Sequence, residues 1–470
     1  MAKYFRCKTD KPALSYRCGE PIVFTVTAHD HCMEMGFQYV EWKVSGDDGQ
    51  QKSGRGSCAP GRPLVIETVL TRPGFVHLEC TAYMRQGNAM EPDFDKLDAG
   101  AGAEIEKIQY CDTIPADYDA FWADAVRQIQ EFPLTVVSRE RLTEGVHPEF
   151  DCWAIELAMP FGCPVTGLLA VPKADGVYPT VVKFHGYGIS TSTVWDHMSF
   201  EPGRIELDIN AHGLPVNIPT FEAYARFAEL ENYGFDEAEN ADPKGCYWYG
   251  MILRDLMAMR FAKTVEKWDT KHLTAYGGSQ GAFQATNVAA HDPDVTLLEI
   301  RIPWFANLNG ENCGYMAGWR PKFAEGLRYF DTAAAASRVT CPVKITAYLG
   351  DYVCPPSTQM ALYANFHCAK AMDMIQSGTH SYRPPEIESY AFRDAPDYPN
   401  GAVRPGRYRH YKGGEYRVLS VGTDSETGQP AAVYQAADGS GKLWVRPAAM
   451  FSEPVETADG VALRFAYLGE

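Results

Sequence analysis

Between residues 110 and 395 the chain alternates segments typical of buried strands with segments typical of helices, and this alternation limits the fold more than any other feature. The runs GLLAVP and PTVVKFHG are short and apolar, as buried strands are, whereas MILRDLMAMRFAKTVEKW has the length and spacing of an amphipathic helix. HLTAYGG and VKITAYLGD are again typical of strands, and PPSTQMALYANF is typical of a helix. Alternation on this scale predicts a parallel α/β sheet.

Both flanks of this region are typical of smaller β domains. In residues 1–108 the runs PIVFTVTA, YVEWKVSG and FVHLECTA alternate apolar and polar positions, which predicts an antiparallel, β-sandwich-like domain. PADYDAFWADAV then begins an α/β domain over 109–395 with a helix that starts near Asp117. Pro and Gly residues predict a linker at 396–404, and short strand-like runs predict a small β domain at 405–470.

The net charge of −17 argues against two classes of partner. An acidic chain is repelled by nucleic acid and by anionic membranes, so we expect neither. No run approaches the about eighteen apolar residues of a membrane span, and the N-terminal segment lacks the apolar core of a secretory signal. We therefore expect a cytoplasmic protein, and the 13 scattered cysteines, none in a CxxC pair, fit a chain without a disulfide framework.

One cluster of metal-ligand residue types lies at His29, Asp30, His31 and Cys32. Adjacent residues of a strand point to opposite faces, and the sequence holds no second cluster that would complete a ligand set. We therefore interpret this stretch as a loop and expect neither a metal nor an organic cofactor.

The pentapeptide Gly277-Gly278-Ser279-Gln280-Gly281 follows a strand-like run and precedes a helix-like run. It fits the G-x-S-x-G pattern of a nucleophile elbow, in which a serine on a sharp, strained turn between strand and helix needs small neighbours. The pattern by itself is common, and its value here comes from the flanking elements. Ser279 is therefore the candidate nucleophile.

A serine nucleophile also needs an acid and a base, which follow it in the order Ser, Asp or Glu, His. Asp351 ends the strand-like run VKITAYLG, and His380 follows a later apolar run within GTH. Functional residues of a parallel sheet lie at the carboxyl ends of its strands, so all three side chains are predicted at one edge. Taken singly, Asp351 could be a helix cap, and His380 could be an ordinary surface or core histidine. The order of the three residues, their spacing along the chain and their positions at strand ends together favour a catalytic triad.

Stabilisation of an oxyanion requires backbone donors close to the nucleophile. One is the N–H of Gln280, directly after Ser279, and the second is expected from Tyr187 in KFHGYG, where glycines let the backbone approach a substrate. His185 in the same loop is interpreted as a bracing residue. Three aromatic residues could line an acyl or sugar pocket or else belong to the core, namely Trp248, Trp304 and Phe305.

These motifs carry a resemblance to a known family. KFHGYG, GGSQGA, LGDYVCPPST and GTH, in this order, resemble the acetyl xylan esterase and cephalosporin C deacetylase family of α/β-hydrolases, as do PADYDAFWADAV and YWYGMILRDLMAMRFA. The resemblance covers about residues 110–395. It implies an α/β-hydrolase core and a cofactor-free serine esterase that removes acetyl groups from sugars such as xylo-oligosaccharides through an acetyl-enzyme. Carried across, Ser279 is the nucleophile, Asp351 the acid and His380 the base. Tyr187 and Gln280 are the oxyanion donors.

The chain departs from the family pattern at three places. Where the family has Arg-Gly-Gln after a strand, residues 211–213 are Ala-His-Gly; Ser381 instead of glutamate follows His380; and Ala282 replaces a glycine. None of these changes removes a residue of the triad. The change at residues 211–213 leaves open how the neighbouring loop is braced and whether the chain assembles into an oligomer. The family often forms hexameric rings, which makes a homo-oligomer one option, but an added N-terminal domain could block that packing.

Residues 405–470 resemble a small bacterial domain family of uncharacterised function, through GRYRHYKGGEYRVL, KLWVRPAAMF and FAYLG. Tyr408, Tyr411 and Trp444 could stack on a sugar there, although such residues more often fill a β core. For the whole chain two rival functions stay open. One is an esterase for a different acyl group or a non-sugar ester; the other is a carbohydrate-binding protein with a decayed hydrolase site, which the complete Ser, Asp and His set argues against.

Overall fold

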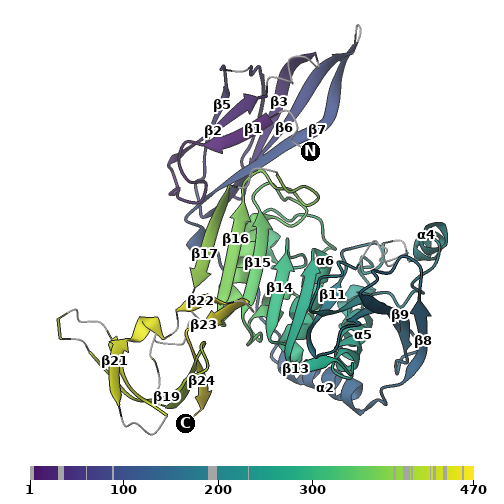
Figure 1. Ribbon diagram of the computed structural model, residues 1–470. Coiled ribbons are helices and arrows are strands. Elements are labelled where there is room, and N and C mark those ends of the chain that lie inside the picture. The colour runs from purple at the N-terminus through teal and green to yellow at the C-terminus, as the bar shows by residue number, and fades with distance from the viewer. Residues whose placement is uncertain are drawn as a thin grey trace.

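A large central sheet, flanked by two β-rich regions, organises the molecule (Figure 1). The computed structural model describes residues 5–29, 36–59, 61–86, 89–188, 198–230, 232–384, 388–394, 403, 406–423, 425–426, 430–437, 442–451, 453–457 and 460–469. Asp30, His31 and Cys32 lie outside the described residues, and so does the predicted linker apart from Val403.

Two antiparallel sheets form the N-terminal region, drawn in purple and blue at the top of Figure 1. One sheet has the order β1-β2-β5 and the other the order β4-β3-β6-β7. Their bounds are β1 Phe5–Thr9, β2 Pro21–Ala28, β3 Phe37–Gly46, β4 Gln51–Gly56, β5 Leu64–Val69, β6 Gly74–Gln86 and β7 Ala89–Ala103. In β6 the side chains of Val76, Leu78 and Cys80 are fully buried and alternate with more exposed ones, as the period of two predicts.

The central sheet has the strand order β17-β16-β15-β14-β13-β11-β12-β10-β9-β8. Its bounds are β8 Val136–Leu142, β9 Phe150–Leu157, β10 Val165–Pro172, β11 Tyr178–Phe184, β12 Ile205–Asn210, β13 Trp268–Gly278, β14 Leu297–Arg301, β15 Val343–Tyr348, β16 Lys370–Ile375 and β17 Ser389–Asp394. Strands β12, β11, β13, β14, β15 and β16 pair in parallel, whereas the strands beyond them at both edges are antiparallel. The predicted parallel sheet is therefore confirmed in its middle, and its edges make it mixed.

Most helices pack behind the sheet in the view of Figure 1, and the one at residues 220–228 lies apart from it at the upper right. The α-helices are α2 Tyr118–Glu131, α4 Thr220–Ala228, α5 Tyr247–Ala262, α6 Gln280–His291, α7 Thr332–Ala336 and α8 Pro356–Asn365. The short 3-10 turns are η1 Ile105–Lys107, η2 Glu239–Ala241, η3 Gly310–Cys313, η4 Glu325–Tyr329 and η5 Ala448–Met450. In the described part of the chain, no helix is both long enough and apolar enough to span a membrane.

The prediction of an amphipathic helix in this region is wrong for α5. The helix starts at Tyr247 and ends at Ala262, and nearly all of its side chains are buried, including Arg254 and Asp255. The reason is its position, because α5 contacts β10, β11 and β12 on one side and α2 and α6 on the other. A helix covered on all sides needs no polar stripe.

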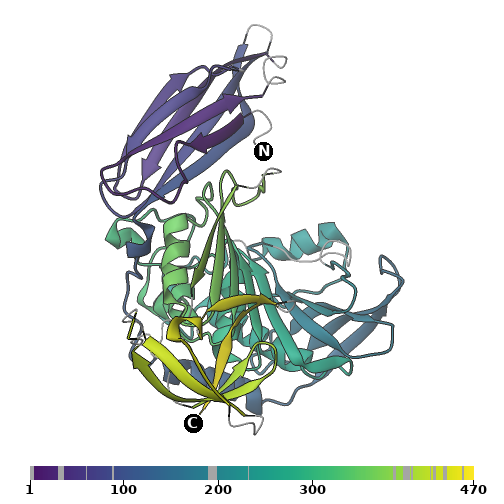
Figure 2. The same ribbon diagram turned by 60° about the vertical axis from the view of Figure 1, so that its left-hand side comes forward.

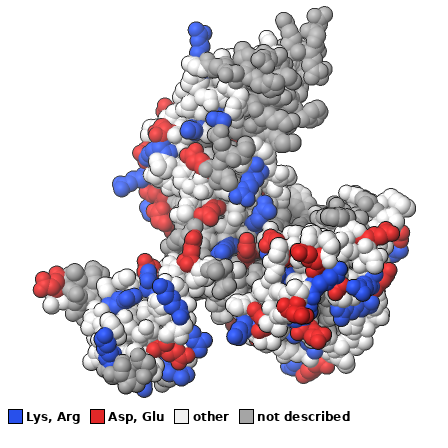
Figure 3. Space-filling model, viewed as in Figure 1, with Lys and Arg blue, Asp and Glu red and all other residues white. Residues whose placement is uncertain are grey.

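The opposite face of the sheet is polar. Thr274 and Tyr276 of β13 are only half-buried, and they alternate with the fully buried Leu273 and Ala275. Acidic and basic side chains are interspersed on the surface of the molecule (Figure 3).

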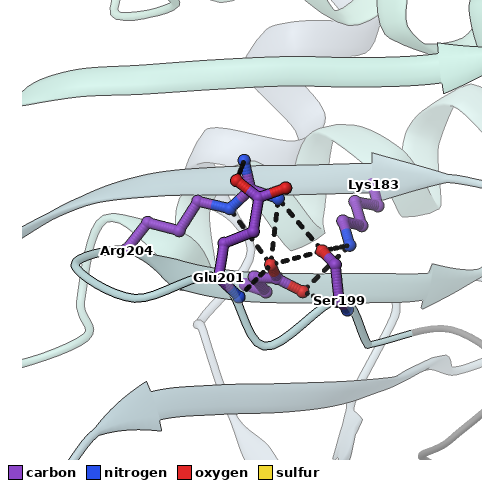
Figure 4. Close-up of polar contacts among 5 residues, drawn as sticks. Lys183, Ser199, Glu201 and Arg204 are labelled. Carbon is purple, nitrogen blue, oxygen red and sulfur yellow. Dashed lines mark hydrogen bonds and ion pairs between the residues drawn. The ribbon is translucent and has the colours of Figure 1, made fainter.

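Glu206 of β12 holds the polar network drawn in Figure 4. Lys183 donates to its carboxylate at 2.9 Å, the Ser199 hydroxyl at 2.6 Å and the Arg204 Nε at 3.0 Å. Burial alone would raise the pKa of Glu206, but these donors and the charges of Lys183 and Arg204 outweigh burial and lower it to about 2. The network stays ionised at neutral pH and ties β11 to β12.

The C-terminal region, yellow in Figures 1 and 2, is a five-stranded sheet with the order β21-β20-β19-β18-β24 and a hairpin of β22 and β23. The bounds are β18 Gly406–His410, β19 Glu415–Thr423, β20 Pro430–Ala436, β21 Leu443–Pro447, β22 Pro454–Thr457, β23 Gly460–Leu463 and β24 Phe465–Gly469. Tyr408 and Val403 belong to its buried core, whereas Tyr411 and Trp444 are exposed. Leu463 packs against Ala369 of the central region.

Candidate active site

Ser279 lies at the sharp turn between β13 and α6. Its backbone has φ 55° and ψ −121°, a conformation that side-chain-bearing residues rarely adopt and that stores strain. The Ser279 N–H donates to the Arg301 carbonyl at 3.0 Å, and the Ser279 carbonyl accepts from the Trp304 N–H at 3.3 Å. Neighbouring strand ends therefore hold the turn in place.

The two outer glycines of the pentapeptide are required by close backbone contacts. A Cβ added at Gly281 would lie 2.0 Å from the Phe184 carbonyl oxygen, and one at Gly277 would lie 2.2 Å from the Gly281 carbonyl. Only glycine lets α6 approach the end of β11 so closely. The structural context expected of a nucleophile elbow is thus present around Ser279.

Asp351 and His380 meet at the carboxyl ends of β15 and β16. The two carboxylate oxygens of Asp351 lie 3.0 Å and 3.2 Å from the Nδ1 atom of His380. Asp351 is fully buried and also accepts hydrogen bonds from the backbone N–H groups of Val353 at 3.0 Å and Cys354 at 2.9 Å. These bonds orient the carboxylate so that it fixes the imidazole with Nδ1–H inward and leaves Nε2 free to accept a proton.

Cys354 connects the serine to this pair. Its thiol, the Asp351 carboxylate and a His380 ring nitrogen lie within 4.8 Å of one another, and its thiol is hydrogen-bonded to the Ser279 side chain. Burial raises the pKa of this thiol well above its usual value, so it is uncharged. Sequence reasoning missed Cys354, since a single cysteine in PPST-type sequence carries no motif.

The three predicted side chains therefore lie at one edge of the sheet. In the part of the chain that the structure describes, the Ser279 hydroxyl makes no hydrogen bond to His380, and such bonds often form only when a substrate is bound. Asp351, Cys354 and His380 are residue types that can ligate a metal. The carboxylate, however, already accepts from His380 and two amides, an arrangement typical of a catalytic acid.

The two expected oxyanion donors also lie near Ser279. Gln280 is the first residue of α6, so no carbonyl within the helix accepts its backbone N–H. A Cβ built on Gly186 would lie 4.0 Å from the Ser279 Cβ, which places the Tyr187 loop beside the serine. Neither the Gln280 nor the Tyr187 N–H donates to another group among the described residues.

Tyr233, which sequence reasoning missed, joins these two donors. Its ring stacks on that of Tyr187 with centroids 4.2 Å apart, and its hydroxyl donates to the Gln280 side-chain oxygen at 2.6 Å. The same hydroxyl accepts from the Gly188 N–H at 3.2 Å. No motif surrounds Tyr233 in the sequence, so only its contacts reveal it.

Two histidines brace the loop that carries Tyr187. His185 accepts from the Ala211 N–H at 2.9 Å, as expected of a bracing residue. His212, at the position where the related motif differs, donates from Nε2 to the Gly188 carbonyl at 2.9 Å and pairs through Nδ1 with the Tyr247 hydroxyl at 2.8 Å. The changed segment therefore still braces this loop.

The aromatic residues singled out from the sequence lie beneath the turn. Trp248 is fully buried, and Trp304 and Phe305 are each 2% exposed. They pack against one another in the core and offer no open ring face to a substrate. An aromatic residue that was not singled out, Trp319, is 42% exposed and touches the ring of Tyr187.

Comparison with known proteins gives two family matches. The family model for acetyl xylan esterase (AXE1) matches residues 101–310 and 321–393. A family described as a protein of unknown function (DUF1653) matches residues 406–467.

Individual relatives agree with the first match. Among curated proteins, the chain is similar to acetyl esterase Axe7A of Xylanibacter ruminicola, with 25% identity over 330 residues that cover 66% of this chain and 72% of that protein. Among solved structures, it is similar to an acetyl xylan esterase from Paenibacillus sp. R4, with 21% identity, a TM-score of 0.51 and coverage of 59% of this chain and 94% of that one. Acetyl xylan esterase 1 from Thermoanaerobacterium sp. JW/SL YS485 has 18% identity, a TM-score of 0.48 and coverage of 59% and 93%.

Proposed function

Because the chain belongs to the acetyl xylan esterase family and is thus a carboxylic ester hydrolase of α/β-hydrolase fold, we propose that it removes O-acetyl groups from short acetylated saccharides. The observation that carries the proposal is the hydrogen-bonded pair of Asp351 and His380 at the sheet edge that also presents the strained Ser279. Names of the similar proteins, an acetyl esterase and an acetyl xylan esterase, support acetyl as the acyl group.

The first half of the proposed reaction transfers the acetyl group to Ser279. As the Ser279 Oγ bonds to the acetyl carbonyl carbon, its proton moves to Nε2 of His380, and Asp351 stabilises the imidazolium through Nδ1–H. The tetrahedral intermediate then collapses. The bond from carbon to the sugar oxygen breaks, the sugar leaves with the proton from His380, and the acetyl-enzyme is left.

Water completes the cycle in the second half. His380 takes a proton from water as the water oxygen adds to the acetyl carbon, and it returns the proton to Ser279 Oγ when acetate leaves. In both halves the backbone N–H groups of Tyr187 and Gln280 donate to the oxyanion. The loss of one such donor typically costs about 2.7–4 kcal/mol of transition-state stabilisation.

The bond between Ser279 and Cys354 has a consequence for this mechanism. To pass its proton to His380, the Ser279 hydroxyl must rotate away from the Cys354 thiol. The Cys354 thiol and a His380 ring nitrogen lie within 4.8 Å of each other. A substrate whose carbonyl oxygen occupies the proposed oxyanion site favours this rotation of the hydroxyl, since the bound substrate places its carbonyl carbon in line with Oγ.

Acetate release tests the proposal directly. We would measure it on acetylated xylo-oligosaccharides and on 4-nitrophenyl acetate, for the wild type, Ser279→Ala and the matched control Ser138→Ala, whose serine is exposed on β8. We expect the wild type and the control to hydrolyse both substrates. Ser279→Ala should lose at least about four orders of magnitude in kcat, since removal of a serine nucleophile leaves only binding and oxyanion stabilisation.

Two outcomes would contradict the proposal in different ways. Activity of Ser279→Ala close to that of the wild type would remove Ser279 as the nucleophile. Turnover of 4-nitrophenyl acetate alone would keep the serine but contradict the saccharide substrate. A fluorophosphonate probe, which reacts only with an activated serine, should label the wild type at Ser279 and leave Ser279→Ala unlabelled.

A further inference from the structure

A ten-residue segment, 311–320, lies between the two ranges that match the acetyl xylan esterase family and belongs to neither. It begins within η3 and has the sequence ENCGYMAGWR. Since the family match leaves this segment out, its contacts have to be considered separately.

The middle of the segment is held by the N-terminal region. The backbone N–H of Met316 donates to the buried Asp47 carboxylate at 2.8 Å. The Arg72 guanidinium lies 4.8 Å from the centre of the Tyr315 ring, a cation–π contact. These contacts bind the segment to a part of the molecule that lies outside the catalytic sheet.

The C-terminal end of the segment is held by the loop of Asp351, the proposed catalytic acid. The backbone N–H of Trp319 donates to the Val353 carbonyl at 3.0 Å, two residues after Asp351. A Cβ at Gly318 would lie 2.4 Å from the Pro355 ring and 2.5 Å from the Val353 carbonyl oxygen, so the backbones are in close contact. Contacts at the middle and at the C-terminal end of the segment therefore define the position of Trp319.

The Trp319 side chain lies beside the proposed oxyanion loop. Its ring contacts that of Tyr187 edge to face, with centroids 4.6 Å apart and an angle of 81°, and stacks on the buried Trp304 at 5.5 Å. Even so, 42% of Trp319 is exposed. Of the large apolar side chains that the structure describes as exposed, Trp319 is the one whose ring touches a candidate site residue.

We propose that the exposed face of Trp319 binds the sugar ring that carries the acetyl ester. This inference rests on the proposed function and names the subsite for its leaving group. An indole held rigidly on one side offers an apolar, electron-rich face that suits the C–H groups of a pyranose, while the sugar hydroxyls stay in water.

The geometry assigns Trp319 to the alcohol side of the ester and not to the acyl side. The carbonyl oxygen of a bound ester points at the Tyr187 and Gln280 amides, and the alcohol oxygen faces His380, which protonates it. His380 is the exposed member of the pair, with 24% of its side chain accessible against 0% for Asp351. The alcohol part therefore extends from His380 toward solvent, and the loop of Asp351, which pairs with His380, also holds the backbone of Trp319.

Steady-state kinetics of Trp319→Ala and Trp319→Phe test the inference. The control is Val177→Ala, because Val177 is an exposed apolar residue (65%) that directly precedes β11, at the end of the strand away from the candidate site. Each variant is assayed on an acetylated xylo-oligosaccharide and on ethyl acetate, whose alcohol is too small to reach the indole. Circular dichroism and thermal unfolding confirm that each variant is folded.

We expect Trp319→Ala to raise KM for the oligosaccharide about tenfold and to leave its kcat and both constants for ethyl acetate within about twofold. Trp319→Phe should recover part of the loss, and Val177→Ala should match the wild type. Unchanged oligosaccharide kinetics, or an equal rise in KM for both esters, would overturn the inference and leave the proposed function intact. A wild type that hydrolyses ethyl acetate but releases no acetate from the oligosaccharide would overturn both.

Discussion

At the scale of single residues, one buried histidine holds the loop that carries Tyr187. His212 is 3% exposed, and burial, assisted by the positive charge of Arg254, lowers its pKa to about 4, although its bond to the Gly188 carbonyl opposes the shift. At neutral pH the imidazole is therefore uncharged. Its Nε2–H donates to Gly188 and its Nδ1 accepts from Tyr247, which is the tautomer that these two partners require.

This pKa predicts an acid-dependent loss of stability. A histidine with a folded-state pKa of about 4 and an unfolded value of 6.5 stabilises the fold above pH 6.5 and loses that contribution as the pH falls toward 4. We expect the unfolding free energy of the wild type to fall by about 2–3 kcal/mol more than that of His212→Gln over this range.

Urea denaturation at a series of pH values measures this difference. Tyr247→Phe is the control, because it removes the hydroxyl but keeps the titrating imidazole and should retain the pH dependence of the wild type. The same dependence of the unfolding free energy on pH in the wild type and His212→Gln would contradict the lowered pKa of His212.

At the scale of elements, the turn at Ser279 depends on how closely α6 packs against β11. The helix begins directly after the serine, and its second residue, Gly281, touches the Phe184 carbonyl at the end of the strand. The contact leaves no room for a side chain. The same approach brings the Tyr187 loop close to the serine that precedes Gln280, so the proposed oxyanion site depends on this packing of strand and helix.

Gly281→Ala should destabilise the protein strongly. The added methyl group would lie 2.0 Å from a backbone oxygen, and overpacking of this kind costs about 3 kcal/mol or more, since backbone must move. The control is Gly250→Ala in α5, where the new Cβ would meet only the end of the Arg254 side chain at 3.5 Å.

Because alanine is the better helix former, the control should be more stable than the wild type by about 0.5–1 kcal/mol. Unfolding in urea gives both values. Equal effects of the two substitutions would show that α6 and β11 are not in close contact.

At the scale of the whole molecule, the N-terminal region packs on the loops that carry Asp351 and His380. The Gln376 side chain, between β16 and His380, donates to the Gly100 carbonyl at 2.7 Å and accepts from the Gly100 N–H at 3.0 Å. His77 pairs with Asp98 at 2.7 Å and stacks on Tyr352, the neighbour of Asp351, with centroids 3.7 Å apart. Figure 2 shows this region above the sheet, in contact at its lower end.

Loss of the Gln376 bridge should weaken this contact. Gln376→Ala leaves the buried N–H and carbonyl of Gly100 unpaired, at a cost of about 2–4 kcal/mol. We expect a lower melting temperature and, by calorimetry, a transition that broadens or splits. The exposed Gln109 provides the control, and Gln109→Ala should unfold as the wild type does. An unchanged transition in Gln376→Ala would mean that the two regions unfold together for another reason.

Local patterns were sufficient to predict most elements and the candidate catalytic residues. The period of two in FVHLECTA predicted β6, because burial of one face of a strand makes every second residue apolar. The alternation of strands with helices predicted a parallel sheet. Ser279, Asp351 and His380 could be named because each follows a strand, and the ends of parallel strands meet. The pattern of α5 was misleading, since its burial on all sides comes from distant elements.

What the sequence determined by itself is therefore the kind of elements, their order and the residues that follow each strand, all of which depend on neighbours along the chain. Only the tertiary structure decided which distant groups touch. Cys354 is hydrogen-bonded to Ser279, and Tyr233 contacts both Tyr187 and Gln280. His212 donates a hydrogen bond to the Gly188 carbonyl, and Trp319 stays exposed beside Tyr187. These residues lie in loops without periodic pattern, and a loop's position is set by the packing of the elements it joins and by contacts with remote segments such as Asp47.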